Sequence, residues 1–255
     1  FNGGTEPEHF EEEMLLASLP RLTDVDKITE GIFAPWAFYR KDFQEIGGHD
    51  PLYAPQSKED SDIFNRFQLN GVKFIQTWEG FVYHMTCRGS RFNPTLTQVG
   101  KESDEWLAQN QRSTRNFIRK WGHFVMHDRL MKPIIPPKFN IGLILNNANE
   151  NSLFHLEPWF DKIWVHSSLV IPYINKEQEN TVIDLSERVR TEFDEYDTDI
   201  VIKLDASELD QETFGYIQKL SEIIHGHGEL GKFELGNLKI EIHSLEEYQE
   251  SLIFI

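Results

Sequence analysis

The sequence predicts an α/β protein in two parts, and three observations carry that prediction. From residue 139 onward, short apolar strands alternate with helices, which is the pattern of a small α/β or α+β domain. Before residue 122, helix-like segments lie among aromatic, strand-like segments, which indicates that this part also combines helices and strands. The sequence KPIIPPK at residues 132–138 is typical of a stiff linker. We expect a first domain at residues 1–132, a linker at 133–138 and a second domain at 139–255.

Local signals predict the elements of the first domain in turn. Residues 6–19 have an acidic start and an apolar end, and Pro20 is expected to close this helix. Ile32 to Phe38 is an apolar, aromatic run that indicates a buried strand or the wall of a binding cleft. Residues 40–46 have helix-forming composition and stop at Gly47-Gly48, because glycine readily adopts the left-handed conformation that ends a helix.

A second helix is predicted at residues 59–69, with apolar side chains on one face and two acids, Glu59 and Asp60, in its first turn. Acids at this position complement the helix dipole. A carboxylate at a helix start, beside an aromatic cleft wall, can also act as a general base toward an incoming hydroxyl group. On these residues alone, both interpretations stay open.

Two strands and a long helix complete the predicted first domain. Residues 73–78 and 81–84 have the composition of strands. Residues 102–121 carry the clearest helical periodicity in the chain, with Ser103 or Asp104 as the cap and a glycine directly after the last residue.

The second domain is predicted to contain a small α/β or α+β fold. Its sequence has β-rich segments bounded by turn residues, and a glycine-asparagine pair between two of them indicates a hairpin. The strands are expected at residues 139–145, 162–166, 199–204, 231–235 and 238–242, and the helices at 210–225 and 244–249.

Two Asp-x-Asp sequences have the form of the motif that binds the divalent ion of a nucleotide sugar. They are Asp24-Val25-Asp26 and Asp197-Thr198-Asp199. Too few residues separate the first from Asp60 for the strands and helices that would have to intervene, so we interpret it as a turn or helix cap. The second has the same weakness, and we expect a metal site at neither.

Charge and composition narrow the function classes. The formal net charge of −17 argues against a nucleic-acid-binding protein, because phosphate attraction needs a basic face. Residues 138–255 hold 9 basic and 23 acidic side chains, so we expect this part to solubilise the protein or to bind a protein partner. No apolar run has the length of a transmembrane helix. The single cysteine, Cys87, excludes an internal disulfide and a multi-cysteine zinc site and favours a cytoplasmic location.

An ordered set of motifs follows the aromatic run. It consists of Tyr39-Arg40-Lys41-Asp42-Phe43, Ile46-Gly47-Gly48-His49-Asp50, Glu59-Asp60-Ser61-Asp62 with Arg66, Gly71-Val72-Lys73 and Val82-Tyr83-His84. This set resembles the acceptor-side half of family 2 glycosyltransferases, whose fold is named GT-A. Five parts in this order and spacing make the resemblance fairly specific, whereas any one part would be weak. Asn110 with Lys120-Trp121-Gly122 also looks like the closing helix of some family members.

The resemblance implies a nucleotide-sugar-dependent transferase that moves a sugar to a carbohydrate or other hydroxyl acceptor with inversion. Asp60 matches the position of the catalytic base, with Glu59 as its partner. A Mn or Mg ion is expected only with a complete donor site. The resemblance further implies an acceptor cleft of Trp36, Arg40, Gly47, Gly48 and Asp50, diphosphate contacts at Arg88 and Arg91, and His84 near the metal.

The chain also departs from the family pattern. By the resemblance, a nucleotide-binding donor half should precede residue 1, and the sequence has no P-loop or glycine-rich dinucleotide fingerprint that would replace it. Two functions therefore stay open: the acceptor-binding half of a transferase, or a non-catalytic binding or assembly module on a truncated transferase framework. A third interpretation, a metal-binding hydrolase in the second domain, requires Asp199, Asp205 and a histidine to converge.

Overall fold

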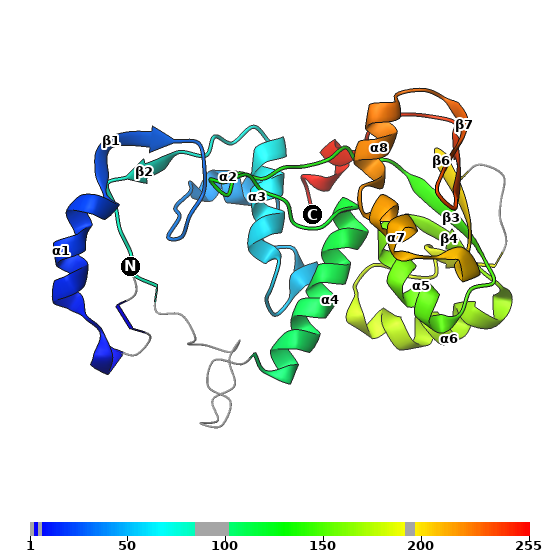
Figure 1. The fold of residues 1–255 in the computed structure, drawn as a ribbon, viewed down its shortest axis with the longest axis horizontal. Helices are drawn as coiled ribbons and strands as arrows, with labels where there is room; N and C mark the ends of the chain where they lie inside the picture. The colour runs from blue at the N-terminus through cyan, green and yellow to red at the C-terminus, as the bar shows by residue number, and fades with distance from the viewer. Residues whose placement is uncertain (1–2, 5–6, 85–101, 192–196) are drawn as a thin grey trace.

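The computed structural model describes residues 3–4, 7–84, 102–191 and 197–255. Three regions follow one another across the molecule: an N-terminal arm, a helical middle region and an α/β unit (Figure 1). The long helix α4 (Asp104–Trp121) lies between the middle region and the α/β unit. None of the helices in these described ranges has the length and apolar character needed to cross a membrane.

The N-terminal arm is the least buried region. It contains η1 (Pro7–His9), α1 (Glu12–Leu22) and β1 (Asp24–Thr29), which pairs antiparallel with β2 (Gln76–Trp78). Two predictions were wrong here. Pro20 lies inside the last turn of α1, which continues to Leu22, instead of closing the helix. The sequence Asp24-Val25-Asp26 opens a strand and is neither a turn nor a helix cap.

The middle region is held by a small core between α2 (Arg40–Glu45), α3 (Glu59–Leu69) and the end of the chain. The chain returns to this core after η7 (Gln249–Leu252), beyond the α/β unit (Figure 1). The helix predicted at 244–249 was wrong, since regular structure begins only with this 3-10 turn. The buried members of the core are Ile46, Ile63, Phe67, Phe74 and Ile253.

The aromatic run does not form the predicted strand. Instead, Trp36 stacks on Phe38 and meets Phe64 edge-on, with ring centroids 5.2 Å apart in each pair. The strand predicted at 73–78 shortens to β2, and the one predicted at 81–84 does not form. A strand needs a neighbour that offers backbone hydrogen bonds. For these segments, the part of the chain that the structure describes provides only the β1–β2 pair.

The long helix matches its prediction. The Ser103 hydroxyl accepts a hydrogen bond from the Trp106 N–H at 3.2 Å, and the helix ends at Gly122, whose φ of +78° favours glycine. One side of α4 packs Phe117 and Trp121 against η2 (Pro51–Tyr53) in the middle region.

The other side of α4 is joined to the α/β unit by a buried ionic network. Arg119 donates to Glu157 at 2.7 Å and to Glu177 at 2.6 Å, and Arg115 and Arg188 complete the network. Burial by itself raises the pKa of Glu157, but the guanidinium groups outweigh it and hold this pKa at about 2. Breaking such a buried pair is costly, so α4 binds the two regions firmly.

The α/β unit is built on a six-stranded mixed sheet, which confirms the predicted α/β class. The strand order is β5-β4-β3-β6-β8-β7, in which the first four strands are parallel and β8 is antiparallel to both its neighbours. The predicted strands and the hairpin were confirmed, except that the two-residue strand β5 was missed. The bounds are β3 (Ile141–Asn146), β4 (Lys162–Trp164), β5 (Val189–Arg190), β6 (Ile200–Asp205), β7 (Gly231–Leu235) and β8 (Leu238–Ile242).

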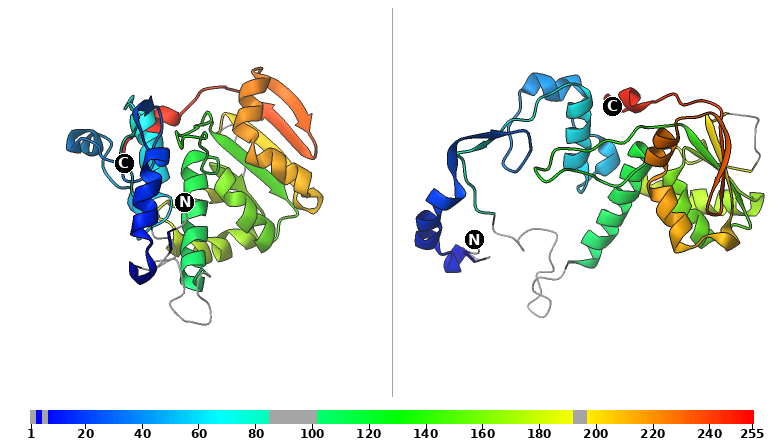
Figure 2. Two further views of the ribbon diagram at one scale, coloured as in Figure 1. Left: turned by 60° about the vertical axis from the view of Figure 1, so that its left-hand side comes forward. Right: turned by 45° about the horizontal axis from the view of Figure 1, so that its top comes forward.

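The helices of this unit pack on one face of the sheet (Figures 1 and 2). Their buried side chains and those of the strands form a single apolar core. The one helix predicted at 210–225 is two, which meet at Lys219, so Ile217 and Leu220 both reach this core. The helices are α5 (Glu150–Leu156), α6 (Ser167–Glu177), α7 (Gln211–Gln218) and α8 (Leu220–His227), with short turns η4 (Glu157–Trp159), η5 (Gln178–Asn180) and η6 (Ala206–Glu208).

Candidate functional site

The segment that leads into α3 fixes the position of its first turn. Ser57 and Lys58 both have left-handed backbone conformations, with φ of +80° and +73°. Both side chains donate to Asn110 Oδ1 of α4, at 2.8 and 2.9 Å. The helix starts at Glu59, as predicted. Helix α4 therefore holds the start of α3 in place.

Asp62 is the most constrained carboxylate of this region. Its side chain is fully buried and accepts hydrogen bonds from Arg66 Nε at 2.7 Å and Trp121 Nε1 at 3.0 Å. Lys120 Nζ lies 2.8 Å away, and the Tyr53 hydroxyl donates at 3.3 Å. Burial and the negative charge of Asp62 raise the pKa of Tyr53, which keeps its donor proton. The carboxylate of Asp62 therefore has hydrogen bonds or ion pairs with four side chains of the protein itself.

The same network connects the Gly47-Gly48 segment to α3 and α4. Arg66 donates to the carbonyl oxygens of Ile46 and Gly48, both at 2.7 Å. Lys120 also reaches the Asp50 carboxylate at 2.8 Å. Motif segments that lie far apart in the sequence are therefore held together by two buried or nearly buried basic side chains.

Asp60 lies two residues before Asp62 in a different environment. It is exposed, and its side chain has no hydrogen bond or ion pair with any residue that the structure describes. Beside it, the Oε2 atom of Glu59 is buried without a partner in the described ranges, as are Nδ2 of Asn65 and Oε1 of Gln68 on the same helix. Buried polar atoms are nearly always paired, with protein groups or with ordered water.

The residues expected in the acceptor cleft differ in their burial and in whether they contact α3. Trp36 is half-buried, and its ring meets Phe64, which lies one turn after Asp60 on the same side of the helix. Gly47 has a φ of +85°, and an added Cβ would lie 3.2 Å from the side chain of the last residue. Arg40 is exposed at the first position of α2. The structure therefore places Trp36 against Phe64, one turn after Asp60 on α3, and leaves Arg40 at the surface.

Of the residues expected at the phosphate and the metal, the structure describes only His84. His84 is exposed and has no hydrogen bond or ion pair within the described ranges. Arg88 and Arg91 lie outside the described residues, as does Cys87. Across those described, no three His, Cys, Asp or Glu side chains converge as metal ligands. The residues in view do not fit the divalent ion that the resemblance implies, and no chemical step is assigned to it.

The third interpretation of the sequence, a metal-binding hydrolase, is not supported. Asp199 precedes β6 and Asp205 ends it, so the two carboxylates lie at opposite ends of one strand. Asp199 accepts a hydrogen bond from the Tyr248 hydroxyl at 2.7 Å, and Asp205 accepts one from Asn147 Nδ2 at 2.7 Å.

Asp62 and Lys120 belong to this network, but neither was assigned a role from the sequence. Asp62 could have been recognised by its spacing to Arg66, because an Asp and an Arg four residues apart meet on one helix face. Lys120 had no comparable signal, since its partners Asp50 and Asp62 come from segments that only the fold brings together.

Comparison of the chain with protein-family models, with curated proteins and with solved structures finds no match. The geometry around α3 is therefore the basis for the function proposed below.

Proposed function

We propose that residues 31–121 form the acceptor-side half of a nucleotide-sugar-dependent glycosyltransferase. The observation that carries the proposal is a contrast between two carboxylates at the start of one helix. Asp62 is buried and paired, whereas Asp60 is exposed and has no hydrogen bond or ion pair with a described residue. The motif residues Gly48 and Arg66 are hydrogen-bonded to each other, and Asp50 joins them through Lys120 and Asp62. This network supports the resemblance because it fixes the backbone of Asp60 and leaves its oxygen atoms available.

In the proposed reaction, Asp60 takes the proton of the acceptor hydroxyl group. The hydroxyl oxygen forms a bond to the anomeric carbon of the donor sugar as the bond from that carbon to the departing nucleoside diphosphate breaks. Attack from the side opposite the leaving group gives inversion. Trp36, on the Asp60 side of α3, offers an aromatic face for a sugar ring of the acceptor.

The test is an Asp60→Asn variant of a chain with its donor half restored, compared with the same chain carrying Asp60. The assay follows nucleoside diphosphate release from a panel of nucleotide sugars with Mn and oligosaccharide acceptors. Removing a general base lowers rates by roughly 100-fold or more. Asp104→Asn is the matched control, because Asp104 is also an exposed acid in the first turn of a helix. Transfer by Asp60→Asn at the unchanged rate would exclude Asp60 as the base.

The alternative function is a non-catalytic binding module, and one observation in the α/β unit favours it. Strands β3 and β6 are adjacent and parallel, and their connections lead away from each other, toward β4 and toward the β7–β8 hairpin. Ligands of open α/β sheets bind at such a switch point, outside the carboxyl ends of the strands. Here Asn147, after β3, donates to Asp205 at the end of β6. A nucleotide is the ligand class that this topology favours.

Calorimetry with a nucleoside diphosphate, with and without Mn, separates the two functions. Binding that is lost in Asp205→Ala but kept in Asp60→Asn places the nucleotide at the sheet and supports the binding module. Binding that Asp205→Ala leaves unchanged contradicts a ligand at the switch point. Sugar transfer by the chain with its donor half restored, sensitive to Asp60→Asn, supports the transferase.

A further inference from the structure

One face of the sheet in the α/β unit has no helix over it in the described part of the chain. The register places pairs of directly opposed residues on this face, such as Ile144 beside Lys203 and Val201 beside Glu241. Largely parallel sheets are usually covered on both faces. We call the accessible side chains of this surface the open face; they are Ile144, Lys203, Lys232, Glu234, Lys239 and Glu241.

The open face carries more lysines than acids. Lys203 and Lys239 are directly opposite each other on β6 and β8. Like charges in this position destabilise a sheet. Neither lysine forms an ion pair with a described residue, whereas Lys232 pairs with Glu241 at 3.3 Å. Glu234 lies opposite Lys239 on β7, so the open face holds three lysines against two acids. In a chain of net charge −17, this local excess of positive charge is a site that an acidic partner would neutralise.

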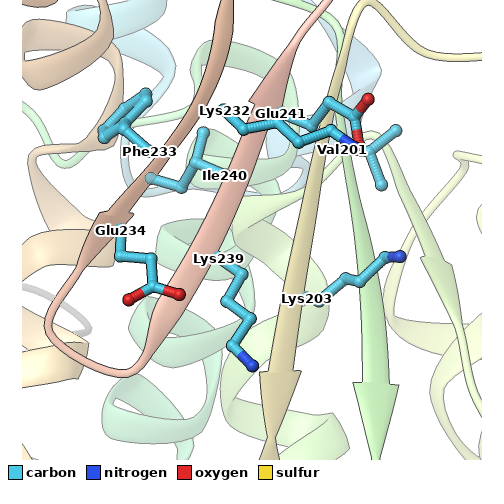
Figure 3. A pocket seen from close by; sticks show the side chains of 8 residues that line it. All are labelled: Val201, Lys203, Lys232, Phe233, Glu234, Lys239, Ile240 and Glu241. Carbon is cyan, nitrogen blue, oxygen red and sulfur yellow. The ribbon is translucent and has the colours of Figure 1, made fainter.

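The same surface is hollowed between the lysines. Figure 3 shows the side chains of Lys203, Lys232 and Lys239 around a hollow of about 360 Å³ that Val201 also lines. The aliphatic stems of lysine cover apolar surface while their charged ends stay in water. The hollow therefore accepts an apolar side chain, provided that acids next to it meet the lysine ends.

Helix α1 has the complementary pattern. Its first turn is acidic, with Glu12 and Glu13, and Leu16 lies one turn later on the same side of the helix. Leu16 is 55% exposed and Met14 is 43% exposed, and no residue of α1 is buried. An amphipathic helix normally buries its apolar residues against another element. Among the residues that the structure describes, no element buries the apolar side chains of α1.

The α1 helix cannot reach the open face of its own chain. The N-terminal arm and the α/β unit lie at opposite ends of the molecule in Figure 1 and in the right-hand view of Figure 2. We propose that α1 of a second copy of this chain docks on the open face, with Leu16 in the hollow and Glu12 and Glu13 against Lys203 and Lys239. Each copy carries both surfaces, so two such contacts close a symmetric dimer.

The test is the mass of the protein in solution, measured by sedimentation equilibrium over a range of concentrations. The unchanged chain is expected to reach the mass of two copies. K203E/K239E and E12K/E13K are each expected to weaken association by about tenfold or more, because like charges would then face each other across the contact. The quadruple variant, which combines K203E/K239E with E12K/E13K, is expected to restore the dimer.

K176E/K219E is the matched control. These lysines lie on α6 and after α7, on the helix side of the unit, and the change in net charge equals that of K203E/K239E. The control is expected to associate like the unchanged chain, which separates the local contact from general repulsion between acidic molecules. A mass of one copy at every concentration, or association that K203E/K239E does not weaken, would overturn the proposal.

Discussion

The middle region and the α/β unit both bury a carboxylate among basic side chains, but they differ in what lies next to it. Around Glu157, Arg119 and Arg188 donate to the carboxylate, which is fully enclosed. Around Asp62, the neighbouring Asp60 is exposed and Glu59 has a buried oxygen without a partner in the described ranges.

This difference indicates that the network around Glu157 stabilises the fold, whereas the network around Asp62 supports the candidate site. Satisfied polar networks rigidify a structure, whereas an exposed carboxylate beside such a network keeps its oxygen atoms accessible to solvent. Both networks reach the same helix, since Arg119 and Lys120 are consecutive residues of α4. The α/β unit therefore braces the turn that carries Asp60.

The largest expected effect comes from breaking the network of the α/β unit. Arg119→Met leaves Glu157 and Glu177 short of a buried cation, which is expected to lower the free energy of unfolding by about 3–5 kcal/mol. Urea unfolding followed by circular dichroism measures the loss. The control is Lys176→Met, because the exposed Lys176–Glu150 pair at 3.9 Å is expected to contribute less than about 0.5 kcal/mol. Equal effects of the two changes would contradict the scaffold role.

Acid is expected to weaken the two regions in different pH windows. Burial lowers the pKa of His123, beside Trp121 at the end of α4, to about 4. The unfolded chain then binds more protons between pH 6.5 and 4, so stability falls by roughly 3 kcal/mol as pH falls through this window. The lowered pKa of Glu157 costs stability only further down, from about pH 4.5 toward 2.

The measurement is the urea midpoint at pH 7, 5 and 4, for the unchanged chain and for His123→Gln. The variant is expected to lose less stability between pH 7 and 4, because its side chain does not take up a proton. An identical loss in both proteins would remove His123 from the explanation.

The carboxylate pair on α3 gives the next effect. Asp62→Asn removes the charge that Arg66 and Lys120 neutralise, and we expect a loss of about 2–3 kcal/mol. Asp60→Asn is expected to change the free energy of unfolding by less than about 0.5 kcal/mol, because Asp60 is exposed and without a described partner. Thermal or urea unfolding distinguishes them. A large loss in Asp60→Asn would make Asp60 a structural residue.

The smallest effect concerns the packing of the sheet. A Cβ added at Gly142 would lie 2.4 Å from the ring of Trp164, so Gly142→Ala is expected to cost about 1–2 kcal/mol. Gly215, inside α7, has open space at the same position. Gly215→Ala is therefore expected to stabilise the protein by up to about 1 kcal/mol. A neutral Gly142→Ala would show that the ring of Trp164 moves freely.

The sequence by itself determined the elements whose signals are local. The cap at Ser103 and the glycine at 122 define α4, the Gly236-Asn237 pair defines the hairpin, and the acids at 59 and 60 begin α3. These features depend on residues a few positions apart. Local patterns misled where the outcome depended on distant partners: the run at residues 32–38 had no strand to pair with and packed as rings instead.

Only the tertiary structure decided which acid is locked and which is free. Asp60 and Asp62 look alike in sequence, but Lys120 and Trp121 reach only Asp62, and they arrive from a helix far along the chain. The core of the middle region likewise needs Ile253, from the last residues. The physical reason is that burial and charge pairing act through space, so residues distant in sequence set the environment of each carboxylate.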